Sequence, residues 1–82
     1  MATIREILLN NGFADAGKCN VCNGTAWKYT KVVNGKICEV KSRILRGEQN
    51  QEIGKGTLRY GGMIAHITPA ILEQVLTHHK LI

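Results

Sequence analysis

The apolar positions at the start of the chain recur at helical spacing. Between positions 4 and 8 the isoleucines and a leucine fall on one side of a helix, and Thr3 precedes them as an N-cap. Glu6, three residues after Thr3, completes the pattern of a capping box. The run stops at Gly12, a residue suited to the left-handed position after a helix. The pattern predicts a short first helix, followed by a polar loop over 15–18.

After Gly24 the pattern changes to alternation. Asn34-Gly35 lies between two β-rich runs, which is a strong signal for a two-residue hairpin turn. Such a turn pairs Val33 with Lys36 and fixes every later pair, so that one face of the hairpin carries both Trp27 and Tyr29. We expect that inner face, which also carries Cys38, Val40 and Ile44, to meet the helices. The outer face then gathers Lys28, Lys41 and Arg43.

The second half of the chain contains another alternating run and a helix start. Residues 53–60 predict a third strand, in which Gly54 and Gly56 mark a bulge or a close backbone approach. Gly61-Gly62 either closes a second hairpin with 63–67 as a fourth strand or leads into an extended connector. Thr68-Pro69 starts a second helix. Its predicted buried stripe is Ile71, Leu72, Val75, Leu76 and His79.

These elements predict one α+β domain over 1–82. Its antiparallel sheet has three or four strands in two hairpins, and the N-terminal and C-terminal helices pack on one face of that sheet. A chain of 82 residues has a small core, so a metal ion or a partner is expected to add stability. An acidic residue at position 6 and the lack of a long apolar run predict a cytoplasmic protein without a membrane partner.

The positive charge is concentrated in the middle of the chain. Eight of the eleven lysines and arginines, but three of the six acidic residues, lie between 25 and 60, so the net charge of +5 arises there. A concentrated excess favours a phosphate-bearing or acidic partner, and the alternative is charge that only keeps the domain soluble. The predicted nucleic-acid-binding residues are Lys28, Lys41, Arg43, Lys55 and Arg59.

The cysteines suggest a metal site. Cys19-Asn20-Val21-Cys22-Asn23-Gly24 has the spacing and the following glycine of half a zinc knuckle. Two further ligands would have to complete a structural Zn²⁺ site. The candidates are Cys38 and His66, with His78 or His79 as alternatives to His66. The other interpretation is a tight loop packed by the cysteines without metal. A redox dithiol is disfavoured because the motif precedes a strand rather than opening a helix.

The sequence contains no group of residues with the spacing of a catalytic site. The histidines at 66, 78 and 79 have no serine, aspartate or glutamate spaced to form a triad or an acid-base pair. The sequence therefore predicts a protein that is not an enzyme.

The order helix, strands, helix resembles the α-β-β-β-α layout of double-stranded-RNA-binding domains and of the HicA toxin family. Residues 7–13, Ile-Leu-Leu-Asn-Asn-Gly-Phe, are similar to the end of that toxin family's first helix, and Gly24-Thr25-Ala26 falls where the family has Gly-Ser-His. Ala26 stands in place of the histidine on which the family's ribonuclease activity depends. The resemblance implies an RNA-binding scaffold without the nuclease.

The sequence predicts a small, basic, non-enzymatic nucleic-acid-binding module that contacts the backbone of RNA or DNA and is stabilised by zinc. No exposed aromatic residues alternate with the basic ones, so contacts to the duplex backbone are expected rather than base stacking. The alternative is a protein-interaction or regulatory module. It docks an acidic protein partner, or forms a homodimer, through a sheet edge or the C-terminal helix.

Overall fold

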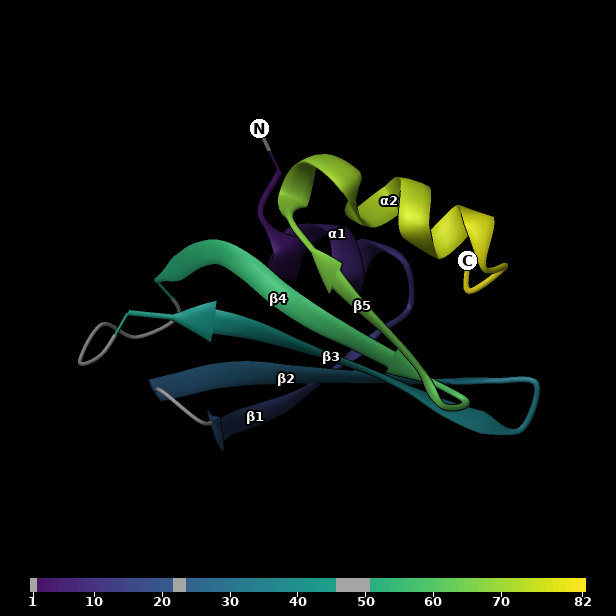
Figure 1. Ribbon diagram of the computed structural model, residues 1–82, viewed down its shortest axis with the longest axis horizontal. Coiled ribbons are helices and arrows are strands. Elements are labelled where there is room, and N and C mark those ends of the chain that lie inside the picture. The colour runs from purple at the N-terminus through teal and green to yellow at the C-terminus, as the bar shows by residue number, and fades with distance from the viewer. Residues whose placement is uncertain (1, 22–23, 46–50) are drawn as a thin grey trace.

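The computed structural model describes residues 2–21, 24–45 and 51–82 (Figure 1). Within these residues the strands form one antiparallel sheet in the order β1-β2-β3-β4-β5, and both helices lie on the same face of it. The fold is α+β, as predicted, but the sheet has five strands. In that part of the chain neither helix is long and apolar enough to cross a membrane. The elements are α1 (Ile4–Asn10), β1 (Ala14–Val21), β2 (Gly24–Val33), β3 (Lys36–Ile44), β4 (Glu52–Tyr60), β5 (Met63–Ile67) and α2 (Pro69–His78).

The central hairpin of β2 and β3 has the predicted register. Asn34 and Gly35 have φ of 52° and 78°, as a type I′ turn requires, and the strands pair without a break from Val33↔Lys36 to Thr25↔Ile44. The inner face of this hairpin meets the helices. Its buried residues include Tyr29, Cys38, Val40 and Ser42.

The predicted polar loop over 15–18 is wrong, because these residues belong to β1. This edge strand pairs with β2 and has a bulge between Asp15 and Lys18, where Gly17 adopts φ of 85°. Polar contacts hold it in place. One Asp15 carboxylate oxygen accepts hydrogen bonds from the Gly17 N–H at 2.8 Å and the Trp27 indole N–H at 2.6 Å.

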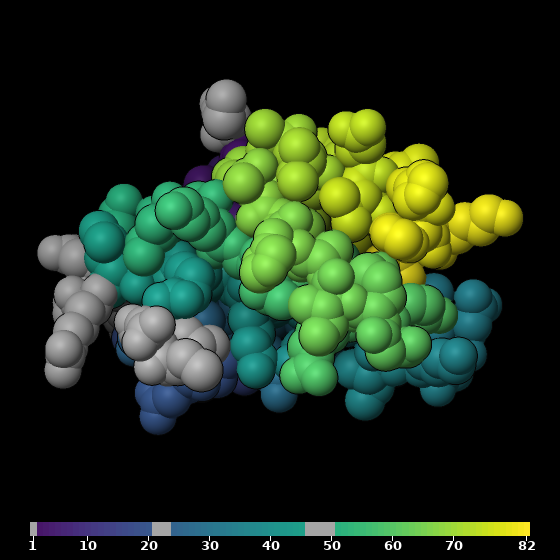
Figure 2. Space-filling view, in the orientation of Figure 1, coloured from purple at the N-terminus to yellow at the C-terminus, as the bar shows by residue number. Residues whose placement is uncertain are grey.

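The glycines of β4 allow a bulge and a close approach to β3. The register shifts between Ser42 and Ile44, where β4 contributes extra residues and Gly54 adopts φ of 89°. A Cβ at Gly56 would lie 2.5 Å from the Lys41 carbonyl oxygen, so only glycine fits there. Residues 63–67 form a strand rather than a connector, and they pair with β4 in the predicted register. Figure 2 shows this β4–β5 hairpin (green) beside α2 (yellow).

Both helices end in the same hydrogen-bonded reversal of the chain. The Phe13 N–H donates to the Leu8 carbonyl at 3.0 Å, and the Leu81 N–H donates to the Leu76 carbonyl at 2.8 Å, which is the Schellman pattern. The reversal after α2 buries Leu81 to 1% exposure. The predicted burial of His79 and Ile71 is wrong: both are exposed, and α2 packs on the core through Leu72 and Leu76, followed by Leu81 after the reversal.

Two charged side chains from the middle of the chain fasten the helices to the sheet. Lys31 Nζ donates to the carbonyl oxygens of Asn11 at 3.0 Å and Leu81 at 2.9 Å, so it binds the ends of both helical segments. The Glu52 carboxylate accepts hydrogen bonds at 2.8 and 2.7 Å from the first two N–H groups of α1. A carboxylate there also interacts favourably with the helix dipole. These charges stabilise the helical layer and lie away from the outer face.

Candidate nucleic-acid interface

A row of polar side chains crosses the uncovered face of the sheet. Lys28 pairs with Lys41, Lys41 with Thr57, and Thr57 with His66, from β2 to β5. Paired residues of antiparallel strands share a face, so all four lie on the outer face, opposite the helices. Strands are about 4.8 Å apart, so this cross-strand row extends over roughly 14 Å.

The remaining predicted cations flank the cross-strand row on the same face. Arg43 follows Lys41 by two positions along β3, and Arg59 follows Thr57 by two positions along β4. Lys55 comes from the bulged part of β4 and lines a hollow together with Arg43 and Thr57. The structure therefore brings all five basic residues nominated from the sequence to one face that no helix covers.

Glu39 partly neutralises the centre of this face. Its carboxylate lies 3.4 Å from Lys28 Nζ and 3.6 Å from Lys41 Nζ. All three side chains keep between a quarter and about a third of their surface exposed, so each ion pair contributes only about 0–1 kcal/mol to stability. These ion pairs order Lys28 and Lys41, the two lysines of the cross-strand row.

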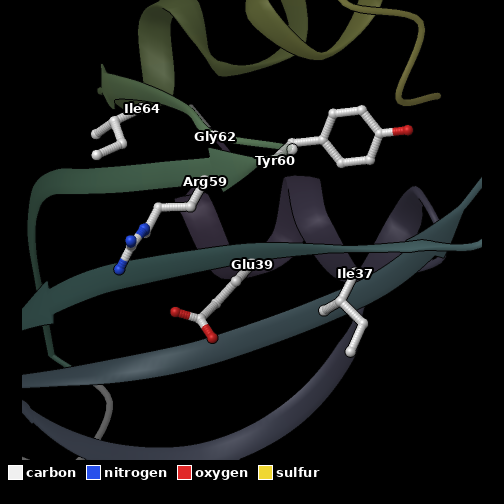
Figure 3. Close-up of a pocket in the computed structure, with 7 residues that line it drawn as sticks. Ile37, Glu39, Arg59, Tyr60, Gly62 and Ile64 are labelled. Atoms are coloured by element: carbon white, nitrogen blue, oxygen red, sulfur yellow. The ribbon is translucent and has the colours of Figure 1, made fainter.

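Two hollows among the described residues of the outer face differ in chemistry. The hollow of about 360 Å³ beside the β4–β5 turn contains Glu39, Arg59 and the apolar Ile37 and Ile64 (Figure 3). In Figure 3 the Arg59 and Glu39 side chains project from the sheet near one another, whereas the Tyr60 ring points away from them. The second hollow, of about 380 Å³, lies at the other end of β4. Its lining residues are Arg43, Ile53, Lys55, Gly56, Thr57 and His66.

Among the predicted zinc ligands, the three that the structure describes, Cys19, Cys38 and His66, lie apart from one another. Cys19 pairs with Ala26 and lies on the outer face, whereas Cys38 pairs with Lys31 on the inner face and is fully buried. Burial raises the pKa of the Cys38 thiol to about 11, which favours the protonated form that metals do not bind. His66 lies on β5, at the opposite edge of the sheet from β1.

The distances follow from the strand order. Four strand spacings separate β1 from β5, which is roughly 19 Å and far beyond the reach of one metal ion. The other histidines, His78 and His79, lie at the end of α2 in the helical layer. No group of three or more histidine, cysteine or acidic side chains in 2–21, 24–45 and 51–82 could hold a metal ion. Cys22 lies outside the residues that the structure describes.

A polar cluster that sequence reasoning missed joins α1 to the first two strands. The Arg5 guanidinium lies 5.6 Å from the centre of the Trp27 ring and 5.9 Å from that of Tyr29, and it forms an ion pair with Asp15 at 3.1 Å. The Gly17 N–H bond, followed by the Trp27 and Arg5 bonds, lowers the pKa of the Asp15 carboxyl. These contacts bring together residues far apart in sequence, so no local pattern could reveal them.

Comparisons of the chain with protein-family models, with curated proteins and with solved structures found no match. Function must therefore be argued from the geometry. The feature with the clearest chemistry is the outer face, where cations from β2, β3 and β4 flank a row of hydrogen-bond donors.

Proposed function

We propose that the outer face of the sheet binds the phosphate backbone of a nucleic acid, without catalysis. The observation that carries the proposal is the cross-strand row, Lys28–Lys41–Thr57–His66, with Arg43, Lys55 and Arg59 beside it. Lysine, arginine and threonine side chains are typical donors to phosphate oxygens. An open face suits an extended polyanion better than a small ligand, because the row runs across several strands.

The composition of this face favours contacts to the backbone over contacts to bases. The described aromatic side chains are on the inner side: Phe13 and Tyr29 are buried in the core, and the Trp27 indole is bound to Asp15. Base-stacking platforms need exposed rings on the binding surface. Charge-dominated binding should have little sequence preference and should weaken steeply with salt.

A protein partner is the second candidate, and the apolar end of the same face favours it. Val32, Ile37 and Ile64 are 69%, 64% and 59% exposed, and they lie near the turns that join β2 to β3 and β4 to β5. Isolated exposed apolar residues are common, but three on one side of a sheet suit a partner that carries both acidic and apolar groups. Light scattering tests the case in which that partner is a second copy.

The decisive experiment is a salt series of duplex RNA and duplex DNA binding, measured by fluorescence anisotropy. The test variant is Lys28→Gln with Lys41→Gln, because glutamine removes charge without crowding Glu39 with new carboxylates. The control is Lys36→Gln with Lys80→Gln, which changes the net charge equally at exposed positions off the outer face. The test variant should lose affinity more than about tenfold, and its salt slope should shrink by about 1.8 because two phosphate contacts are lost.

The control variant should bind almost as tightly as the native protein. Equal losses in both variants would mean that net charge alone, rather than this face, attracts the nucleic acid. Failure of the native protein to bind either duplex at low salt would refute the proposal outright. A dimer seen by light scattering in that case would support the second candidate.

A further inference from the structure

The bulge in β4 creates a hollow at one end of the cross-strand row. Between the pairs Ser42↔Gly56 and Ile44↔Glu52, the single residue Arg43 lies opposite three residues of β4. This surplus bends β4, while Gly56, which pairs with the inner-face residues Ser42 and Ile67, lets the backbone of β4 approach β3 closely. Bulges commonly re-aim side chains beside binding sites. The result is a concave site of about 380 Å³, near the lower end of the usual range for ligand sites.

Hydrogen-bond donors from neighbouring strands line this hollow. Lys55 and Thr57 contribute from β4, and His66 contributes from β5, directly paired with Thr57. Arg43 lines the β3 side, and its guanidinium extends toward Gly24, where Nη2 lies 3.6 Å from the position a Cβ would take. The Arg43 stem therefore forms a wall, and its charge adds to the positive potential above β2 and β3.

The hollow differs from the rest of the face in its charge. No carboxylate occurs among its described lining residues, whereas the other hollow contains Glu39. Glu39 binds Lys28 and Lys41, on the side of the cross-strand row that faces the hairpin turns. The described lining of this hollow therefore combines positive charge with a concave surface.

We infer that this hollow binds a phosphate monoester, of the kind that ends a nucleic-acid strand. A monoester carries about −1.5 to −2 charges at neutral pH and has three acceptor oxygens, so it requires several converging donors. Lys55, Thr57 and His66 provide such donors, and a concave site can surround a chain end but not a continuous backbone. This inference rests on the proposed function: the cross-strand row binds the backbone, and the hollow binds its terminal phosphate.

The test compares one short duplex with 5′-phosphates, one with 3′-phosphates and one with hydroxyl ends. The native protein should bind one of the phosphorylated duplexes at least about tenfold more tightly than the hydroxyl form, because the added charge meets several donors at once. In the Lys55→Gln, His66→Gln variant that ratio should fall to about one. Lys28→Gln is the control: it should weaken binding of all three duplexes and leave the ratio unchanged. Both variants alter exposed or half-exposed side chains, and a urea melt verifies their folding.

The possible results separate this inference from the proposed function. Equal binding of the three duplexes, with the loss of affinity in Lys28→Gln retained, would overturn the phosphate hollow and leave the backbone interface standing. If no duplex binds, the proposed function fails, and titration with inorganic phosphate followed by amide NMR decides about the hollow alone. Saturable shifts at Lys55, Thr57 and His66 would then support an anion site for free phosphate, and their absence would refute it.

Discussion

Two lysines of the basic segment should have opposite roles although they lie only ten positions apart. Lys31 Nζ donates to two backbone carbonyls, one at each helical end, and lies 5.7 Å from the centre of the Phe13 ring. Lys41 Nζ lies 3.6 Å from a carboxylate oxygen of Glu39 on the outer face. Replacing either lysine by methionine removes the same charge and keeps a side chain of similar length. The pair therefore separates what charge does for the fold from what it does for binding.

The expected change in stability follows from these contacts. A hydrogen bond from a charged donor contributes about 1.5–3 kcal/mol, and since Lys31 is only half-buried we use the lower values, which gives roughly 3 kcal/mol for its two bonds. A domain of this size loses about 4–8 °C in Tm per kcal/mol, so Lys31→Met should lower the Tm by more than about 10 °C. Lys41→Met gives up one partly exposed ion pair and should change the free energy of unfolding by less than about 1 kcal/mol.

The same two variants are then compared in urea unfolding and in duplex binding. Lys31→Met should bind with nearly native affinity below its unfolding temperature, because its ammonium faces the helical layer. Lys41→Met should lose about one unit of salt slope. Equal stability in the two variants would refute the structural role of Lys31. Equal loss of binding would refute the assignment of the interface to the outer face.

Three further variants test single features of the fold and face. Glu52→Gln should lower the free energy of unfolding by about 1–2 kcal/mol in a urea melt, because the start of α1 loses a charged acceptor. The control Glu73→Gln, at an exposed position of α2, should leave the free energy of unfolding unchanged. In a Cys22→Ser background, native protein at about pH 8 should be alkylated at the half-exposed Cys19 and not at Cys38, as mass spectrometry would show. Burial raises the pKa of Cys38 from 9.0 to about 11, so the thiol of the unfolded chain ionises at lower pH than that of the folded protein. The free energy of unfolding should therefore decrease between those pH values, and this decrease should be absent in Cys38→Ala. Glu39→Gln should strengthen duplex binding severalfold at low salt by removing a carboxylate bound to two lysines of the cross-strand row; weaker binding would mean that Glu39 matters by positioning these lysines.

The central hairpin could be predicted because local and long-range signals agree there. Asn34-Gly35 specifies the turn, and the turn fixes the register for the full length of both strands. The alternation then decides which face is buried, since a slip by one residue would expose Trp27 and bury Lys41. Lys28, Lys41 and Arg43 could be assigned to the outer face for the same reason, whereas Lys55 and Arg59 belong to β4, whose register this turn does not fix.

The first strand could not be predicted because its own residues do not show it. The segment 14–21 has no run of large apolar residues, carries Asp15 and Lys18, and has a glycine at its bulge. It is a strand because β2 offers it a free edge, and because Asp15 can bind the Trp27 indole across that edge. The separation of Cys19 from Cys38 could not be predicted for a related reason: once 14–21 pairs with β2, the two side chains lie on opposite faces of the sheet.

Lys28 and Lys41 on the outer face contribute little to the stability of the fold. The charges that stabilise the molecule do so from the other side: Lys31 and Glu52 bind helical backbone, and Arg5 binds Asp15 and the Tyr29 hydroxyl. On the outer face, the ion pairs of Glu39 are partly solvated and contribute about 0–1 kcal/mol each. Like charges paired across adjacent strands, as Lys28 and Lys41 are, are themselves destabilising. Lys28 and Lys41 thus lie side by side on the uncovered face with the Glu39 carboxylate paired to them, and the polyanion proposed above would neutralise their remaining charge on binding.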